Sequence, residues 1–218
     1  MDKLIVETTA DGSHTLFLPE MDEHYHSVNG AVQESNHVYI DAGFNQCQKE
    51  EIHVLELGFG TGLNALLTAL QAEQRGIRIF YTSLEKFPLP QMITEQLNYS
   101  EANKTLYQTL LQTDWGIRIQ VNPYFNLHKI QTDFNDFDFS GKYDVVYYDA
   151  FAPDKQPEVW SQKLFDAIYN GMNPEGILTT YCAKGNIRRM MQQAGFTVVR
   201  IPGPPGKREM LRARKVVC

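Results

Sequence analysis

The fold of this 218-residue chain is decided by the stretch His53-Val54-Leu55-Glu56-Leu57-Gly58-Phe59-Gly60-Thr61-Gly62-Leu63-Asn64. Its first part is an apolar run of the kind that a parallel sheet buries on both faces. Three alternate glycines follow, and a backbone without Cβ atoms can turn sharply there and lie close to a ligand. Leucines then recur at helical spacing, so a helix is expected to begin near Gly62. Strand, glycine turn and helix N-terminus together predict a ligand site lined by free N–H groups.

The spacing of the three glycines favours one nucleoside ligand over another. A dinucleotide-binding turn has the pattern G-x-G-x-x-G, but here the third glycine comes one residue earlier and residue 63 is Leu. The pattern E-x-G-x-G-x-G resembles motif I of the class I S-adenosylmethionine (SAM) methyltransferases. That resemblance implies a SAM site with cofactor contacts from Glu56, Gly58, Gly60, Thr61, Gly62 and Asn64. A nicotinamide site and a turn without a ligand are the alternatives.

Acidic residues end three of the following predicted strands. Glu85 ends the strand at residues 77–85, and in doubly wound folds an acid at that tip accepts hydrogen bonds from ribose hydroxyls. Asp133 and Asp149 follow later strands, and ligands of open α/β sheets bind at these carboxyl ends. A surface Glu and a turn Asp that caps a short helix are the alternatives for Glu85 and Asp133.

Asp149 follows apolar and aromatic residues, so its carboxylate is expected to be partly buried and to hold a proton more easily. Such a carboxylate suits a reaction whose nucleophile is an amine, because the ammonium form has no lone pair and must lose a proton before the nitrogen can attack a methyl sulfonium. Tyr148 and Phe151 are predicted either to stack on a base or to be plain core aromatics.

Strands and helices alternate along residues 46–218, which predicts one α/β domain with an open, Rossmann-like sheet. The last two strands have no helix between them, so the final strand is expected to run antiparallel. Residues 1–45 are expected to form a small N-terminal β appendage that covers substrate and cofactor, with a hairpin over residues 4–18 and a short strand at residues 38–40. Helices are expected over residues 63–75, 89–98, 101–112, 157–170 and 186–194.

Composition and short sequence patterns bear on membrane insertion, secretion, disulfides and metal binding. No run of about 18 apolar residues predicts a membrane span, and residues 1–7 lack the order of a signal peptide. The three cysteines, at positions 47, 182 and 218, form no C-x-x-C pair. The pair His24-x-His26 lacks an accompanying carboxylate or thiol pattern, so no metal is expected. We expect a cytoplasmic protein with free thiols.

Charge is segregated along the chain. The net charge is −6, yet residues 175–218 carry nine Lys and Arg against two Glu, while residues 1–174 carry 11 Lys and Arg against 24 Asp and Glu. A basic segment of this kind is suited to phosphate. We therefore predict contacts with nucleic-acid phosphates, and a solvated basic edge is the alternative. The predicted contacts come from Lys184, Arg188, Arg189, Lys207 and Arg208.

Several blocks together resemble one family, the methyltransferase domain of the bifunctional tRNA wobble-uridine enzyme MnmC and its stand-alone relatives. They are residues 34–39, 56–64, 83–89, 149–160 and 207–211, of which the block D-x-F-A-P-x-K-x-P-x-x-W is the most specific. The family often has Gly where this chain has Ala150. The resemblance implies that SAM methylates the primary amine of 5-aminomethyl-2-thiouridine at position 34, in the anticodon loop of tRNA. No second glycine fingerprint for a flavin oxidase is present, so another enzyme is expected to supply the aminomethyl group.

The resemblance also implies roles for individual residues. Asp149 corresponds to the catalytic acid, Glu85 to the ribose ligand and Asp133 to the acid beside adenine. The implied cofactor contacts extend to Tyr25, Glu34, Lys86 and Asp149, and the implied substrate contacts to Phe151, Lys184, Arg188, Lys207 and Arg208. Three other functions stay open: a small-molecule amine methyltransferase, an aminopropyltransferase related to spermidine synthases, and a non-catalytic tRNA-binding protein.

Overall fold

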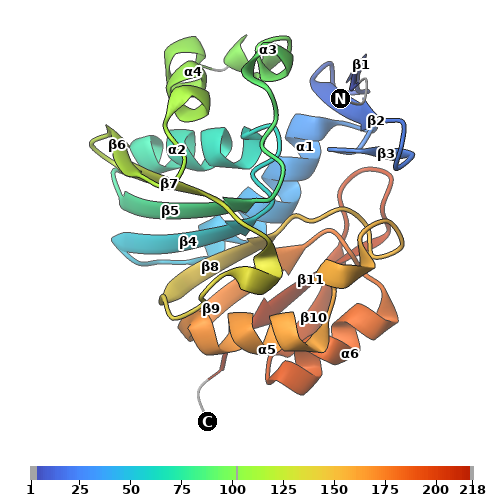
Figure 1. Cartoon of the computed structure of the whole chain (residues 1–218). Helices are drawn as coiled ribbons and strands as arrows, with labels where there is room; N and C mark the ends of the chain where they lie inside the picture. The colour runs from blue at the N-terminus through green and yellow to red at the C-terminus, as the bar shows by residue number, and fades with distance from the viewer. Residues whose placement is uncertain (1–3, 102, 217–218) are drawn as a thin grey trace.

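The computed structural model describes residues 4–101 and 103–216 and has two sheets (Figure 1). The larger sheet has eight strands in the order β10-β11-β9-β8-β4-β5-β7-β6. In chain order these are β4 (Glu51–Leu57), β5 (Arg78–Glu85), β6 (Arg118–Asn122), β7 (Phe125–Gln131), β8 (Tyr143–Tyr148), β9 (Met172–Thr180), β10 (Thr197–Pro202) and β11 (Glu209–Arg214). Strands β7, β5, β4, β8 and β9 pair in parallel. β11 lies antiparallel between β9 and β10, which confirms the predicted α/β sheet and its antiparallel last strand.

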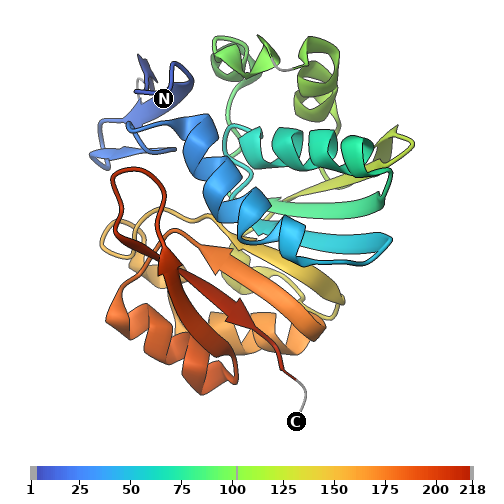
Figure 2. The same cartoon turned by 180° about the vertical axis from the view of Figure 1, so that it is seen from behind.

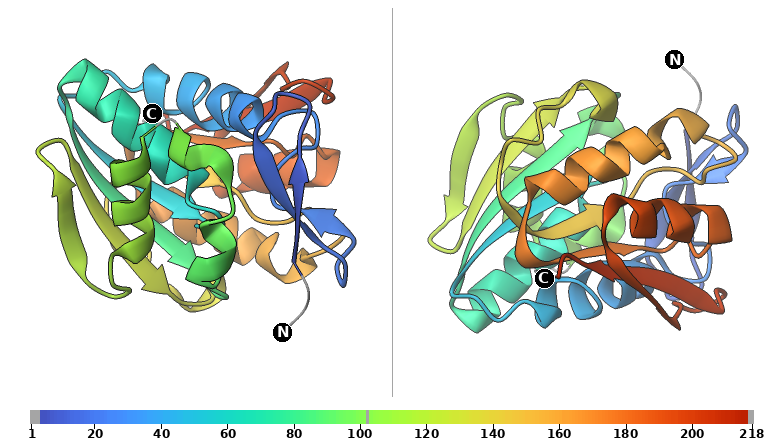
Figure 3. Two further views of the ribbon diagram at one scale, coloured as in Figure 1. Left: turned by 90° about the horizontal axis from the view of Figure 1, so that it is seen from above. Right: turned by 90° about the horizontal axis from the view of Figure 1, so that it is seen from below.

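Helices cover both faces of this sheet, as the views from above and below show (Figure 3). One face carries α2 (Leu63–Arg75) and α4 (Lys104–Gln112), and the other carries α5 (Gln162–Gly171) and α6 (Gly185–Ala194). Each face has its own apolar core, so burial on both sides explains why the central strands read as continuous apolar runs. The carboxyl ends of β4, β5 and β8 therefore meet at one edge of the sheet.

The N-terminal segment forms a separate antiparallel sheet of β1 (Ile5–Thr8), β2 (His14–Leu18) and β3 (Glu23–His24). After it come α1 (Ala31–Ser35) and a π-helix, η1 (Asn36–Asp41), which run on as one helix beside α2, in front of the main sheet in Figure 2. The predicted strand at residues 38–40 is therefore wrong. All three of those side chains are buried, and a short apolar run does not distinguish a strand from a buried helical turn.

The predicted helix at residues 89–98 is also wrong in its extent. Only α3 (Gln91–Thr94) is α-helical there, and the 3₁₀ helix η3 (Asn98–Glu101) follows. The Asn98 side chain accepts a hydrogen bond from the His14 N–H and donates one to the Gly12 carbonyl, which ties this segment to the β1–β2 hairpin. Three further 3₁₀ turns are η2 (Phe44–Gln46), η4 (Phe134–Asp136) and η5 (Pro157–Val159).

The structure also bears on the expectations of no membrane span and of free cysteine thiols. Within the described ranges, no helix is long and apolar enough to cross a membrane. Cys47 and Cys182 are free and buried, whereas Cys218 lies outside the described residues.

Candidate active site

The turn after β4 is held by backbone contacts to the neighbouring strands. The N–H groups of Gly58 and Phe59 both donate to the Leu84 carbonyl of β5, and the Asp149 N–H donates to the Leu57 carbonyl. Gly58 has a φ of 100°, and a Cβ there would lie 2.4 Å from the Asp149 carbonyl oxygen. Only glycine fits this close approach, so the motif brings the end of β4 directly against the end of β8.

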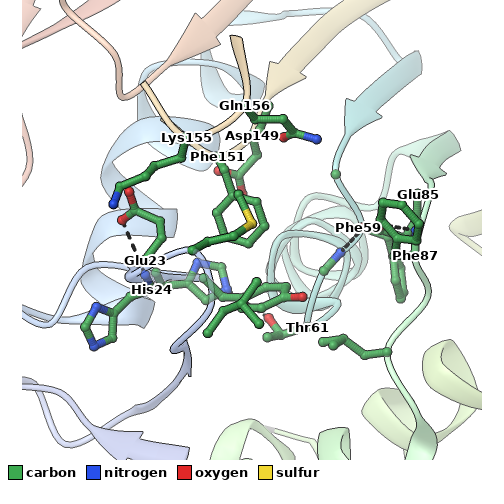
Figure 4. A pocket seen from close by; sticks show the side chains of 18 of the residues that line it. Glu23, His24, Phe59, Thr61, Glu85, Phe87, Asp149, Phe151, Lys155 and Gln156 are labelled. Carbon is green, nitrogen blue, oxygen red and sulfur yellow. Dashed lines mark hydrogen bonds between the residues drawn. The ribbon is translucent and has the colours of Figure 1, made fainter. Parts of the chain in front are cut away.

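Glu85 connects this turn with the end of β5. Its carboxylate accepts hydrogen bonds from the Gly60 N–H at 3.1 Å and from the Phe87 N–H at 2.8 Å (Figure 4). Burial raises the pKa of Glu85, while the backbone N–H donors partly oppose that rise. We call residues 58–62 together with Glu85 the glycine wall of the site.

Asp149 lies next to the glycine wall, at the end of β8, where its backbone N–H donates to the Leu57 carbonyl of β4. One carboxylate oxygen accepts a hydrogen bond from the Tyr39 hydroxyl at 2.6 Å, and the other accepts one from the Asn64 side-chain amide at 2.8 Å. Burial raises the pKa of Asp149 to about 7, and the hydrogen bonds and Lys207 act in the opposite direction. The group is therefore balanced between its charged and neutral forms near neutral pH, as a proton acceptor requires.

A pocket of about 1260 Å³ lies between the glycine wall, Asp149 and the N-terminal sheet. Ligand pockets are typically about 300–1,000 Å³, so this one is larger than a typical pocket for a single ligand. Most residues predicted for the site line it, and these are Tyr25, Glu34, Gly58, Gly60, Thr61, Asn64, Glu85, Lys86, Asp149, Phe151 and Lys207. Figure 4 shows Glu85 and Asp149 at separate places around the space, with Phe151 beside Asp149 and Phe87 beside Glu85.

Three residues predicted to contact the cofactor are not among those that line the pocket. Gly62 is the N-cap of α2, where it has a left-handed conformation. Glu56 is fully buried and accepts a hydrogen bond from the Ser83 hydroxyl, and burial raises its pKa to about 8. Asp133 caps η4 and pairs with Lys86 at 2.8 Å, so Phe134 and not Asp133 faces the cavity.

The basic residues predicted to contact phosphate differ in their surroundings. Lys184 pairs with Asp154, and Arg188 is partly buried on α6. Arg189 and Arg208 are exposed. Lys207 alone turns into the pocket, where its ammonium lies 2.7 Å from the Glu34 carboxylate.

Some residues of the site were missed by sequence reasoning. Tyr39 contacts Asp149, and Tyr181 donates a hydrogen bond from its hydroxyl to the Ala150 carbonyl at 2.8 Å. His26 lies 2.8 Å from the Thr61 hydroxyl, which fastens the glycine turn to the N-terminal segment. Burial lowers the pKa of His26 to about 4, so the ring is neutral. A tyrosine at each of positions 39 and 181 was visible in the sequence, but nothing local distinguished them from core aromatics.

Within residues 4–101 and 103–216, no group of three or more His, Cys, Asp and Glu could hold a metal ion. His24 instead lies 3.0 Å from Glu7, whereas His26 faces Thr61.

Comparison with known proteins defines the class. A family model described as S-adenosyl-L-methionine-dependent methyltransferase matches residues 92–216, more than half of the chain. The chain therefore belongs to this family of SAM-dependent methyltransferases, and its cofactor is SAM. The residues present fit that cofactor, since the glycine turn leaves no Cβ between ligand and backbone and Glu85 offers a carboxylate for ribose hydroxyls.

Two solved structures share the fold. The crystal structure of MNMC2 from Aquifex aeolicus is 24% identical, with a TM-score of 0.78 over 98% of this chain and 70% of that chain. The spermidine synthase from Thermotoga maritima is 12% identical, with a TM-score of 0.55 over 99% of this chain and 74% of that chain. The resemblance to the MnmC methyltransferase domain seen in the sequence thus recurs in the fold.

Proposed function

We propose that this protein transfers a methyl group from SAM to the primary amine of 5-aminomethyl-2-thiouridine at wobble position 34 of tRNA. The observation that carries the proposal is Asp149, a partly buried carboxylate on the pocket wall that accepts hydrogen bonds from Tyr39 and Asn64 and whose pKa burial raises to about 7. The sequence blocks shared with the MnmC methyltransferase domain and the likeness in fold to MNMC2 support this choice of substrate.

The geometry suggests how the residues of this chain act. Bound SAM supplies an electrophilic methyl group on its sulfonium. Tyr39 and Asn64 each hold one oxygen of Asp149, which fixes the plane of the carboxylate. Each oxygen keeps a lone pair for the incoming amine, so Asp149 can bind it, accept its proton and direct the nitrogen lone pair. Holding the amine in line with the methyl group would supply much of the rate.

Pocket size supports a large acceptor. A cofactor held at the glycine wall leaves the space beside Phe151, Tyr25 and Tyr181 for a second ligand. The rings of Tyr25 and Phe151 meet edge to face, with centroids 5.1 Å apart. Aromatic faces of this kind are where an unstacked nucleobase binds.

A methyl-transfer assay tests the proposal. Total tRNA from a cell that lacks this gene is incubated with the protein and methyl-labelled SAM, and its nucleosides are then separated. We expect label in the 5-methylaminomethyl derivative of wobble uridine. No label in tRNA, with SAM binding intact, would contradict the proposal. Small amines, and putrescine with decarboxylated SAM, would then be the substrates to assay next.

A further inference from the structure

Lys207 is held inside the pocket by contacts that a surface lysine does not make. It lies on the loop between β10 and β11, and its ammonium is 2.7 Å from a Glu34 carboxylate that is almost buried. The same ammonium lies 3.9 Å from the centroid of the Tyr181 ring. That ring is anchored in turn, because the Tyr181 hydroxyl donates to the carbonyl of Ala150, the neighbour of Asp149. Lys207 is thus a fixed positive charge beside Asp149.

We propose that Lys207 is a positioning residue for the acceptor amine, whose charge, held in place by Glu34 and Tyr181, favours the ionised form of Asp149 and disfavours a protonated amine at the same place. The part of this inference that concerns the amine rests on the proposed function. The part that concerns Asp149 rests on the position of Lys207 in the same pocket, where its ammonium contacts Glu34 and the Tyr181 ring. It is an alternative to the phosphate contact that the sequence predicts for Lys207.

The positive charge of Lys207 matters because of the other groups that surround Asp149. The groups that act on its carboxylate from the elements around it are Tyr39, Asn64, Glu34, Glu56, Tyr81, Tyr181 and Lys207. Among these groups Lys207 is the one cation, and it lowers the pKa of Asp149, whereas burial and Glu34 raise it. The groups around Lys207 itself are Glu34, Tyr181, Asp149, Cys182 and His26, and burial keeps His26 neutral.

Methyl transfer requires a neutral acceptor amine and a group that can take up the proton released. In the transfer a nitrogen–carbon bond forms with the lone pair of the neutral amine, and the sulfur–carbon bond breaks with its electron pair passing to sulfur. The product nitrogen carries one proton too many, which passes to Asp149 or to water. A protonated amine has no lone pair, so a nearby cation that shifts the amine toward its neutral form raises the reactive fraction.

The adjacent residue offers a contrast. Arg208 is exposed and does not line the pocket, although it carries the same charge one position further on. Neutralising Arg208 should therefore change the salt dependence of tRNA binding, and neutralising Lys207 should instead change the titration of Asp149.

The test measures the pKa of Asp149 directly. Carboxyl ¹³C signals of the full-length, ligand-free protein are titrated by NMR, and Asp149→Asn identifies the signal. We expect Lys207→Gln to raise the pKa by roughly half a unit or more and Lys207→Arg to leave it near the wild-type value. Lys163→Gln, which removes an exposed charge on α5 outside the pocket, is the control and should cause no shift.

An unchanged Asp149 titration in a Lys207→Gln protein that is folded by circular dichroism would overturn the inference. If the salt dependence of tRNA binding in that variant were also flattened as much as in Arg208→Gln, Lys207 would be assigned to phosphate instead. Lys207→Met, which keeps the aliphatic stem over Tyr181, replaces Lys207→Gln if that variant fails to fold. Because the titration uses no substrate, its failure is distinct from a failure of the proposed methyl transfer.

Discussion

The glycine wall and the side of the pocket around Asp149 are held by different kinds of contact. In the glycine wall, backbone N–H groups of Gly58, Phe59 and Gly60 bind the Leu84 carbonyl and the Glu85 carboxylate. Around Asp149, the contacts are made by side chains that arrive from residues far apart in the chain, from Glu34 to Lys207. The glycine wall should therefore tolerate most changes of side chain but few substitutions of its glycines. Around Asp149, by contrast, the loss of a single charged group or hydroxyl should change the properties of the site.

The largest effect is expected from Asp149→Asn, which removes the proposed proton acceptor and leaves the glycine wall unchanged. Loss of a general base costs about 10²–10⁴-fold in rate, so methyl transfer should fall by that factor while SAM binding by calorimetry stays close to wild type. Asp154→Asn, an exposed change on the same loop, is the control. Normal turnover by Asp149→Asn would remove the role assigned to it.

Gly58→Ala should break the glycine wall itself. Its new Cβ would lie 2.4 Å from the Asp149 carbonyl oxygen at a φ of 100°, so the turn must shift. We expect a loss of about 3 kcal/mol of stability together with weakened SAM binding, measured by denaturant unfolding and calorimetry. Gly76→Ala is matched in conformation but meets nothing within 4 Å, so it should cost only about 1–2 kcal/mol and leave SAM binding intact. Equal effects of the two changes would contradict this account.

A smaller effect is expected from basic residues on the surface outside the pocket. Arg189 and Arg208 are exposed, and the proposed tRNA substrate would meet them through phosphates. Neutralising both to Gln should reduce the slope of log affinity against log salt by about 1.4–1.8, as measured by filter binding. The Lys163→Gln protein should keep the wild-type slope. If the double variant also keeps it, these residues do not contact phosphate.

The smallest expected effect is a shift in the pH dependence of the reaction when a hydrogen bond to Asp149 is removed. Since Asp149 must be ionised and has a pKa of about 7, kcat/KM should rise as pH increases through about 7 and then level off. Tyr39 donates to the carboxylate and so favours the charged form, which means that Tyr39→Phe should move this rise to higher pH. A hydrogen bond of about 1 kcal/mol corresponds to about 0.7 pKa unit. A rise at the same pH in the variant would show that the Tyr39 hydroxyl does not tune Asp149.

Local patterns explain why the glycine wall was predictable. Apolar runs marked β4 and β8, the glycines marked the turn, and parallel strands bring Glu85 and Asp149 to one edge of the sheet. The predicted strand at residues 38–40 failed because an isolated apolar run carries no information about its partner. Packing against α2 and β9 makes this segment a π-helix and points Tyr39 at Asp149.

The sequence by itself determined the α/β sheet, the glycine turn and the acids at the strand tips, because each follows from periodicity and spacing within a few residues. Only the tertiary structure decided which distant side chains surround Asp149. Tyr39 reaches it through a helical turn, and Lys207 is drawn into the pocket by a nearly buried Glu34 on a segment far away in the chain. Charge pairs of this kind depend on burial and distance in space, which a linear pattern of charges does not contain.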